Sequence, residues 1–142
     1  FMGDTVVDAE FAEDGTVKSV GTQNFGNIRL YADNFVLASG SFFSKGLIAT
    51  PDRIYEPVFG VDLSYAEGRD QWFDRNFWKK QNYISYGAKV SKFLHASIDG
   101  KPVANLYAIG SLISGSNTLY EGCGGGIALM TALAAADGIL DK

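Results

Sequence analysis

Residues 119–138 read Leu119-Tyr-Glu-Gly-Cys-Gly-Gly-Gly-Ile-Ala-Leu-Met-Thr-Ala-Leu-Ala-Ala-Ala-Asp-Gly138. The glycines lead into an alanine-rich segment, which predicts a helix over Ile127–Leu140. Glycine lets a bound molecule press against the main chain and tolerates positive φ, while the amino end of a helix offers unpaired N–H groups and the positive end of its dipole. A flexible linker is the alternative, but linkers carry serine and polar filler. We therefore expect a cofactor cradle for an electron-rich ring edge, a carbonyl or a phosphate, formed by Gly122, Gly124, Gly125, Gly126 and Ile127.

Two predicted strands end at a Gly-Ser pair. Phe35-Val-Leu-Ala38 is a short apolar run, expected to be buried on both faces, and it stops at Ser39-Gly40-Ser41. Asn105-Leu-Tyr-Ala-Ile-Gly110 is a second such strand and is followed by Ser111. Because ligands bind where the carboxyl ends of parallel strands turn, Gly40, Ser41, Gly110 and Ser111 are further candidates for cofactor contact. A tight turn that needs no ligand is the alternative for each glycine alone.

The remaining elements follow from local patterns. Residues Thr5–Val20 predict a β-hairpin, and a third strand around Asn27–Tyr31 would complete a β-meander. From Phe42 to Pro102 the chain is rich in aromatic residues, which we interpret as an inserted or capping region of mixed structure. Within it we expect a helix over Tyr65–Gln81, with Trp72, Phe73 and Phe77 as its buried side, and a strand over Ser85–Lys92. A loop, Ser111–Tyr120, precedes the glycine run.

Composition narrows the class of protein. The chain has 142 residues, 46% of them hydrophobic, and a formal net charge of −4, which argues against a nucleic-acid surface. A single cysteine, Cys123, and a single histidine, His95, argue against a disulfide framework and against a metal site, so no metal is expected. No segment approaches the roughly 20 apolar residues that span a bilayer. Because strand-like sequence starts within a few residues, and without a signal-peptide layout, we expect a portion of a larger protein.

The blocks together resemble the carboxyl-terminal part of flavoproteins with two dinucleotide-binding domains. In that superfamily a β-meander precedes a strand with an Ala-Thr-Gly signature, here Ala38-Ser-Gly40, and the last strand ends as in Ala108-Ile-Gly-Ser111. A closer resemblance, to the B-type subunits of anaerobic glycerol-3-phosphate dehydrogenases, rests on blocks that occur in the same order: Gly40-Ser-Phe-Phe-Ser-Lys-Gly-Leu47, Arg53-Ile-Tyr-Glu-Pro57, Gly60-Val-Asp62, Asn105–Ser111 and Glu121-Gly-Cys-Gly-Gly-Gly-Ile-Ala128.

This resemblance implies the fold. We expect an α/β chain that forms the C-terminal part of an FAD/NAD(P)-binding fold, of two- or three-layer ββα type, with a β-meander and a small αβ insert. The expected parts are residues 1–47 as meander and return strand, 48–102 as a substrate-side or subunit-contact insert, and 103–142 as final strand, Gly-rich turn and helix.

The resemblance also implies a function. The family oxidises sn-glycerol 3-phosphate to dihydroxyacetone phosphate in a quinone-linked complex, and the cofactor expected is a flavin, FMN or FAD. The expected partners are a catalytic A-type flavoprotein subunit and an iron–sulfur C-type subunit that anchors the complex. The expected location is cytoplasmic, peripheral to the inner face of the cell membrane, with membrane association only through the partner. Another flavoprotein of the same fold, fumarate-reductase-like or amine-oxidising, and a non-catalytic electron-transfer or assembly subunit remain open.

Individual residues carry further hypotheses. His95 is a candidate base for the substrate hydroxyl, with a buried or exposed structural histidine as the alternative. Arg53 is the candidate for the substrate phosphate, although basic residues are more often solvated surface. Cys123 lies near a helix amino end, which favours a lowered pKa, but a small residue packed in a tight loop is the preferred interpretation.

Two features depart from the flavoprotein pattern. The chain lacks a Gly-x-Gly-x-x-Gly strand–turn–helix, and Ser111 stands where many relatives carry an acidic residue. We therefore expect these 142 residues alone not to hold flavin tightly.

Overall fold

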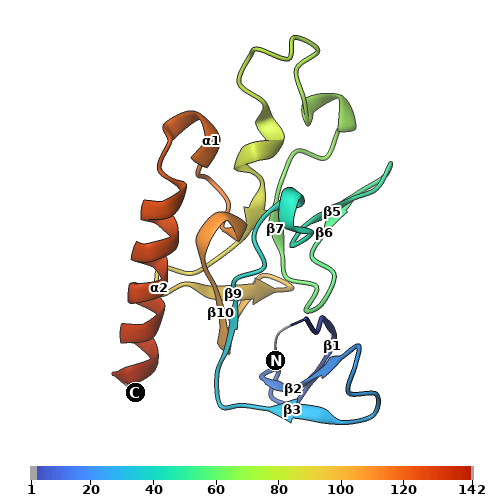
Figure 1. Cartoon of the computed structure of the whole chain (residues 1–142), viewed down its shortest axis with the longest axis vertical. Helices are drawn as coiled ribbons and strands as arrows, with labels where there is room; N and C mark the ends of the chain where they lie inside the picture. Colours follow the sequence, from blue (N-terminus) through green and yellow to red (C-terminus); the bar gives the residue numbers. More distant parts are fainter. Residues whose placement is uncertain (1–2, 142) are drawn as a thin grey trace.

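The computed structural model describes residues 3–141 as an α/β arrangement with α2 along one side (Figure 1). The strands are β1 (Val6–Phe11), β2 (Val17–Thr22), β3 (Arg29–Tyr31), β4 (Phe35–Leu37), β5 (Ile48–Ala49), β6 (Ile54–Tyr55), β7 (Leu63–Ser64), β8 (Gly87–Ala88), β9 (His95–Ile98) and β10 (Lys101–Ala108). The helices are α1 (Thr118–Glu121) and α2 (Gly124–Leu140), and the 3₁₀ helices are η1 (Phe42–Ser44), η2 (Arg69–Gln71), η3 (Asn82–Ser85) and η4 (Gly110–Leu112).

The first three strands form the predicted meander. β2 lies between β1 and β3 and is antiparallel to both, with Ala9 opposite Val20 and Ser19 opposite Tyr31. The hairpin prediction is therefore confirmed, as is the third strand. Asp14 holds the turn between β1 and β2, because its carboxylate accepts hydrogen bonds from the N–H and the hydroxyl of Thr16 at 2.9 and 2.7 Å.

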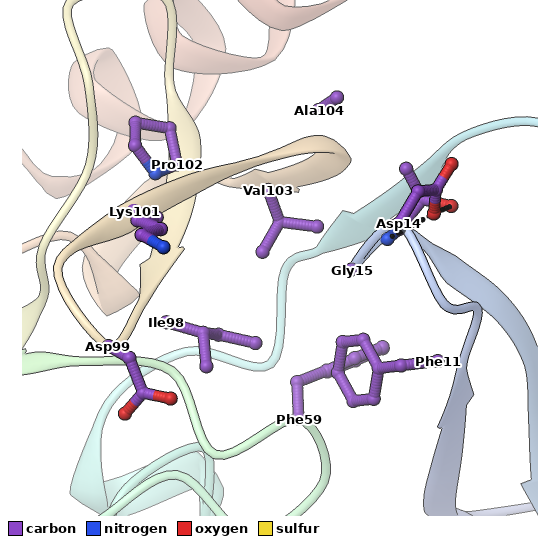
Figure 2. Close-up of a pocket in the computed structure, with 11 residues that line it drawn as sticks. Phe11, Asp14, Gly15, Phe59, Ile98, Asp99, Lys101, Pro102, Val103 and Ala104 are labelled. Atoms are coloured by element: carbon purple, nitrogen blue, oxygen red, sulfur yellow. Dashed lines mark hydrogen bonds between the residues drawn. The ribbon is translucent and has the colours of Figure 1, made fainter.

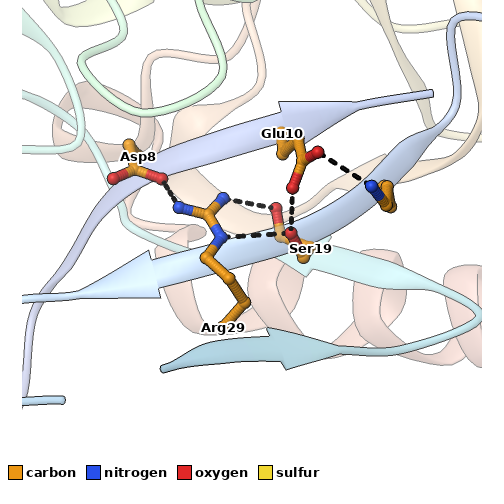
Figure 3. Close-up of polar contacts among 5 residues, drawn as sticks. Asp8, Glu10, Ser19 and Arg29 are labelled. Atoms are coloured by element: carbon orange, nitrogen blue, oxygen red, sulfur yellow. Dashed lines mark hydrogen bonds and ion pairs between the residues drawn. The ribbon is translucent and has the colours of Figure 1, made fainter. Parts of the chain in front are cut away.

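A polar network fixes the register of the meander (Figure 3). The fully buried hydroxyl of Ser19 accepts a hydrogen bond from Arg29 Nε at 3.1 Å and donates one to Glu10 at 3.1 Å. Arg29 also pairs with Asp8, and Lys18 pairs with Glu10 at 2.8 Å. A slip by one residue would move these groups away from their partners, so the network favours one pairing.

The second sheet brings the two predicted Gly-Ser strands together. β4 is parallel to β10, with Phe35 opposite Leu106 and Leu37 opposite Ala108, and β9 is antiparallel to β10 on its other side. β10 begins at Lys101, earlier than predicted, because a hairpin turn at Asp99 joins it to β9. The prediction that Phe35–Ala38 is buried on both faces is wrong, since Val36 is 46% exposed on the edge strand β4.

Asn105 connects the two sheets. Its side-chain amide accepts a hydrogen bond from Val17 N–H at 2.9 Å and donates one to Val17 C=O at 2.8 Å. It donates a further bond to the carbonyl of Asp33 at 3.2 Å. One side chain therefore holds the meander against β10.

The middle region is built mostly from turns and short strand pairs. β5 pairs with β6, and β7 pairs with β8, each over two residues. The predicted strand over Ser85–Lys92 is reduced to β8, with one further bridge between Val90 and Ala96. The backbone of Gly87 lies close to that of Leu112. A Cβ on residue 87 would be 2.2 Å from the carbonyl oxygen of Leu112, which explains why this position of β8 is a glycine.

The predicted helix over Tyr65–Gln81 is wrong. Only η2 forms within it, because Asp74 and Asn76 side chains accept hydrogen bonds from backbone N–H groups two residues further on, at 2.8 and 3.1 Å. Such local bonds compete with helical ones. Trp72 is buried as expected, whereas Phe73 and Phe77 are exposed.

The core lies around β10. Leu106, Ala108 and Leu112 are fully buried there and pack with residues of the middle region, including Ala88 and Ala96. Burial of each leucine side chain contributes about 1.5–3 kcal/mol. The core thus fixes the carboxyl ends of β4 and β10, where the candidate site lies.

Candidate functional site

The ends of β4 and β10 turn at the same place. Ile109 N–H donates to the carbonyl of Leu37 at 3.1 Å, so the parallel pairing reaches the residue directly before Gly110 on β10 and Leu37, three residues before Gly40, on β4. Gly40 has φ of +76° and Gly110 has φ of +68°, and a Cβ on Gly40 would lie 3.5 Å from the hydroxyl of Ser111. The structure therefore brings together Gly40, Ser41, Gly110 and Ser111.

A tight loop after β4 adds a glycine that sequence reasoning missed. Gly46 N–H donates to the carbonyl of Ser41 at 3.0 Å, and a Cβ on Gly46 would lie 2.0 Å from the carbonyl oxygen of Gly40. Only glycine fits such a close approach of two backbones. The available signal was a second glycine shortly after Gly40, in the run Ser44-Lys-Gly46.

Helix α2 is fastened to the end of β10 by Thr131. Gly110 N–H donates to the Thr131 hydroxyl at 2.9 Å, and that hydroxyl donates to the carbonyl of Ile127 at 2.6 Å. This residue was also not predicted, because a single threonine in an alanine-rich helix gives no local signal. The contact places the turn of Gly110 against the second turn of α2, seven residues after the first residue of the helix, Gly124.

The glycine run is an ordered turn between two helices. Asn117 caps α1 by accepting a hydrogen bond from Tyr120 N–H at 3.1 Å, and Gly122 ends α1 with φ of +63°. A left-handed glycine of this kind is a common way to end a helix. The expected helix begins earlier than predicted, at Gly124, and the linker alternative is wrong for this segment.

The amino end of α2 is open for a ligand. Cys123 precedes the helix and gives no side-chain capping bond, so the first-turn N–H groups lack that partner. A Cβ on Gly125 or Gly126 would meet nothing within 4 Å, so the chain itself does not require glycine there. Glycines that no neighbour requires, at an uncapped helix end, fit a cofactor that lies against the backbone.

The thiol of Cys123 does not behave as predicted. Its pKa is raised, first by desolvation and then by Glu121, whose carboxylate accepts a hydrogen bond from the thiol at 3.5 Å and carries negative charge. The expectation of a lowered pKa at the helix end is therefore wrong. The interpretation as a small residue in a tight turn agrees with this finding.

A cavity of about 540 Å³ opens beside the same strand end. Ala38, Ser39 and Gly46 line it, together with Glu56 and Phe59. The buried Ser39 hydroxyl has no hydrogen-bond partner among residues 3–141. The cavity has the size of a small-molecule site, but Gly40, Ser41, Gly110, Ser111 and the glycine run do not line it.

His95 lies away from the gathered glycines. It begins β9 opposite Tyr107, and the two rings are 4.4 Å apart at 36°. Tyr107 is fully buried near Gly138 of α2, and it precedes Gly110 by three residues, about 10 Å of strand. The structure thus does not join His95 to the cradle, and its role as a base stays a prediction.

Arg53 is also apart from the cradle. Its guanidinium lies over the ring of Tyr55, 5.0 Å from the centroid, at the β5–β6 hairpin. Figure 1 shows this hairpin on the side of the molecule away from α2. Its role toward a substrate phosphate stays a prediction too.

A second cavity, of about 450 Å³, lies between the β1–β2 turn and the β9–β10 hairpin. Figure 2 shows Phe11, Phe59, Ile98 and Val103 around it, with Asp14 and Asp99 at its edges. None of the predicted site residues lines it. It separates the tip of the meander from the second sheet.

The described residues contain neither a metal-binding cluster nor a membrane-spanning helix. Within residues 3–141 no cluster of three or more His, Cys, Asp or Glu side chains could hold a metal ion. Of the helices that the structure describes, none has the length and apolar character to cross a membrane.

Comparison with known proteins identifies the class. The chain belongs to the FAD binding domain family, which it matches over residues 1–127. The expectation of a flavin-binding α/β chain is thereby confirmed. No solved structure matches the chain.

The relatives narrow the resemblance to the B-type subunits of anaerobic glycerol-3-phosphate dehydrogenases. The one from Haemophilus influenzae (strain 86-028NP) is 46% identical over 145 residues, which cover 99% of this chain and 33% of the relative. The one from Vibrio vulnificus (strain CMCP6) is 41% identical over 135 residues, covering 94% and 31%. That of Pectobacterium atrosepticum is 46% identical over 116 residues, covering 82% and 28%. The chain therefore spans about a third of the length of these relatives, and the predicted resemblance is confirmed.

Proposed function

We propose that the intact protein is a flavin-dependent subunit of an anaerobic, quinone-linked sn-glycerol-3-phosphate dehydrogenase, which oxidises glycerol 3-phosphate to dihydroxyacetone phosphate. The observation that carries the proposal is the gathering of the turns at Gly40 and Gly110 at one end of a parallel strand pair, with the second turn of α2 fastened to Gly110. The family match and the relatives from glycerol-3-phosphate dehydrogenases support the cofactor and substrate classes.

The residues of this chain would bind and orient the flavin. N–H groups at Gly125 and Gly126 would face the electron-rich edge of its ring, since that of Ile127 already donates to the Cys123 carbonyl at 3.0 Å. The dipole of α2 would stabilise negative charge there. Gly40, Ser41, Gly110 and Ser111 would line the adjoining surface. The flavin would supply the chemistry by accepting a hydride or an electron pair from the substrate. The FAD-binding family favours FAD over FMN.

The finer arrangement belongs to the same proposal. Residues 1–47 and 103–142 would form the meander, strand and helix parts of the FAD/NAD(P)-binding fold, and residues 48–102 the substrate-side or subunit-contact insert. An A-type flavoprotein subunit and an iron–sulfur C-type subunit would complete the complex on the cytoplasmic face of the membrane. The relatives are themselves named as one subunit of an enzyme, which supports a multi-subunit assembly.

The test is turnover of the intact complex with sn-glycerol 3-phosphate and an artificial electron acceptor. Reduction that depends on glycerol 3-phosphate, together with flavin in the purified protein, is expected. The substrate class would be contradicted if the flavin-containing protein did not oxidise glycerol 3-phosphate but did turn over another substrate of flavoproteins of this fold. The same assay should be run with the variants His95→Gln and Arg53→Gln. A variant changes KM or kcat only if the replaced side chain acts on the substrate.

A second candidate is a non-catalytic electron-transfer subunit of the same fold. The placement of His95, about 10 Å of strand from Gly110, favours it, because the described residues then bring no histidine to the cradle. Flavin that is reduced by the A-type partner, but not by glycerol 3-phosphate when the B-type protein is alone, would support this candidate.

A further inference from the structure

The loop between η2 and η3 turns aromatic side chains outward. Phe77 and Trp78 are 80% and 85% exposed, and their rings pack edge to face with centroids 5.4 Å apart. Phe73, on the same loop, is 50% exposed. The loop forms the upper end of the molecule in Figure 1. We refer to Phe73–Lys80 as the tip.

The outward position of these rings is built into the loop. Gln81 lies behind the tip, where its amide oxygen accepts a hydrogen bond from Asp74 N–H at 2.9 Å and its amide nitrogen donates to the carbonyls of Asn76 and Lys79 at 3.1 and 3.0 Å. The Asn76 side chain accepts a further bond from Trp78 N–H at 3.1 Å. The side chains of Gln81, Asp74 and Asn76 thus satisfy the backbone of the loop, while its large apolar side chains stay exposed. Several exposed large apolar side chains in one loop are unusual for a solvated surface.

The charge of the tip differs from that of the chain. Arg75, Lys79 and Lys80 are exposed there, against the single carboxylate of Asp74, which pairs with Lys79 at 3.6 Å. The chain as a whole carries a net charge of −4. A cationic surface with exposed aromatic rings, on an otherwise acidic chain, fits a ligand that is both anionic and apolar.

We propose that the tip binds directly to an anionic lipid surface. Trp78 and Phe77 would enter the interfacial layer, where aromatic rings with one polar edge are favoured, and the lysines would contact the headgroups. A protein partner is less well matched, since protein interfaces are enriched in aromatic residues and arginine but depleted of lysine. This contact would add to attachment through a partner protein, the only route expected from the sequence.

The tip and the cradle lie at the same end of the molecule. η3, which follows the tip, contacts α1, and α1 leads into the glycine turn at Gly122. Figure 1 shows both near the upper end. Binding through the tip would therefore hold the proposed flavin end of the molecule close to the membrane. The inference itself needs no flavin and no turnover.

The experiment is flotation of the intact protein with vesicles of phosphatidylcholine alone or with phosphatidylglycerol. Binding is expected only with phosphatidylglycerol. The double variant Phe77→Ser with Trp78→Ser should bind at least about tenfold more weakly than the wild type. Lys80→Gln should bind about fivefold more weakly. Brominated lipid should quench the fluorescence of the wild type more than that of Trp78→Phe, because Trp72 is buried.

Phe93 offers a matched control. It is 62% exposed and has Lys92 over its ring, with the amine 4.7 Å from the centroid, but it lies outside the tip. Phe93→Ser should bind vesicles as the wild type does. Absence of binding to anionic vesicles, or equal binding by the tip variant, would overturn the proposal. So would loss of a co-purifying protein partner from the tip variant while vesicle binding is unchanged, since the tip would then be a protein contact.

Discussion

Replacing Gly126 by alanine should change fold stability and flavin affinity in opposite directions. Glycine in a helix is less stable than alanine by about 0.5–1 kcal/mol, and a Cβ at Gly126 would meet no atom within 4 Å. The flavin-free intact protein should therefore become more stable by about that amount. Gly125 has the same open surroundings and should behave in the same way.

The same Cβ would stand between the proposed flavin edge and the backbone. Moving the ring away would weaken a hydrogen bond from a first-turn N–H, which is worth about 1–3 kcal/mol when the acceptor carries or develops charge. The dissociation constant for flavin should rise by about 5- to 150-fold. Flavin titration of the apoprotein, followed by fluorescence quenching, measures this change, and thermal unfolding of the apoprotein measures stability without the ligand's contribution.

Gly138→Ala provides the control within the same helix. A Cβ there would lie 3.9 Å from Tyr107 Cε1, an ordinary contact, and Gly138 is about 18 Å along the helix from Gly126. It should gain stability and keep its flavin affinity. If Gly126→Ala bound flavin within twofold of wild type, or if Gly138→Ala weakened binding equally, the cradle interpretation would be refuted.

Three further predictions concern the scaffold. Asn105→Ala should lower the free energy of unfolding by about 1–3 kcal/mol, because the N–H and C=O of Val17 lose their partners, and denaturant unfolding would show no change if the bridge were irrelevant. Glu56→Gln should destabilise the protein by a similar amount. The buried carboxylate accepts hydrogen bonds from the N–H groups of Val58, Phe59 and Gly60 at 3.0, 2.7 and 2.9 Å, whereas glutamine would turn an N–H donor toward one of them. Equal melting temperatures of the variant and the wild type would contradict this. The pKa of Glu10 is lowered from 4.5 by hydrogen bonds from Lys18 and Ser19, so its contribution is present above pH 4.5 and is lost as the pH falls through the lowered pKa. Glu10→Gln should therefore lose less stability on acidification than wild type, as measured by melting temperature against pH, and parallel profiles would exclude the effect.

Local signals predicted the parts of the fold that local chemistry determines. The meander followed from β-forming residues around the Asp14 turn, and the glycine-to-helix transition followed from composition. The common Gly-Ser ending of the two strands was visible in the sequence, whereas their parallel pairing appears only in the structure. The helix over Tyr65–Gln81 failed since its aromatic spacing looked helical, while Asp74 and Asn76 bound the backbone in turns.

The parts of the site that escaped prediction depend on tertiary contacts. Thr131 matters because it meets Gly110 across the molecule, and Gly46 because it meets Gly40. No periodic pattern in the sequence indicates either contact. The raised pKa of Cys123 likewise depends on desolvation of the thiol and on the carboxylate of Glu121 beside it. Single candidate residues such as His95 and Arg53 carried no spacing that could have placed them relative to the glycines.

Backbone hydrogen exchange of the intact protein, with and without flavin, tests the central claim most directly. The account predicts that flavin protects three separate segments, Gly40–Gly46, Gly110–Leu112 and Gly122–Ala128, while the β5–β6 hairpin and the β1–β2 turn exchange as before. Protection around Arg53, or in the cavity at Phe11 and Val103, without protection of Gly122–Ala128 would contradict it.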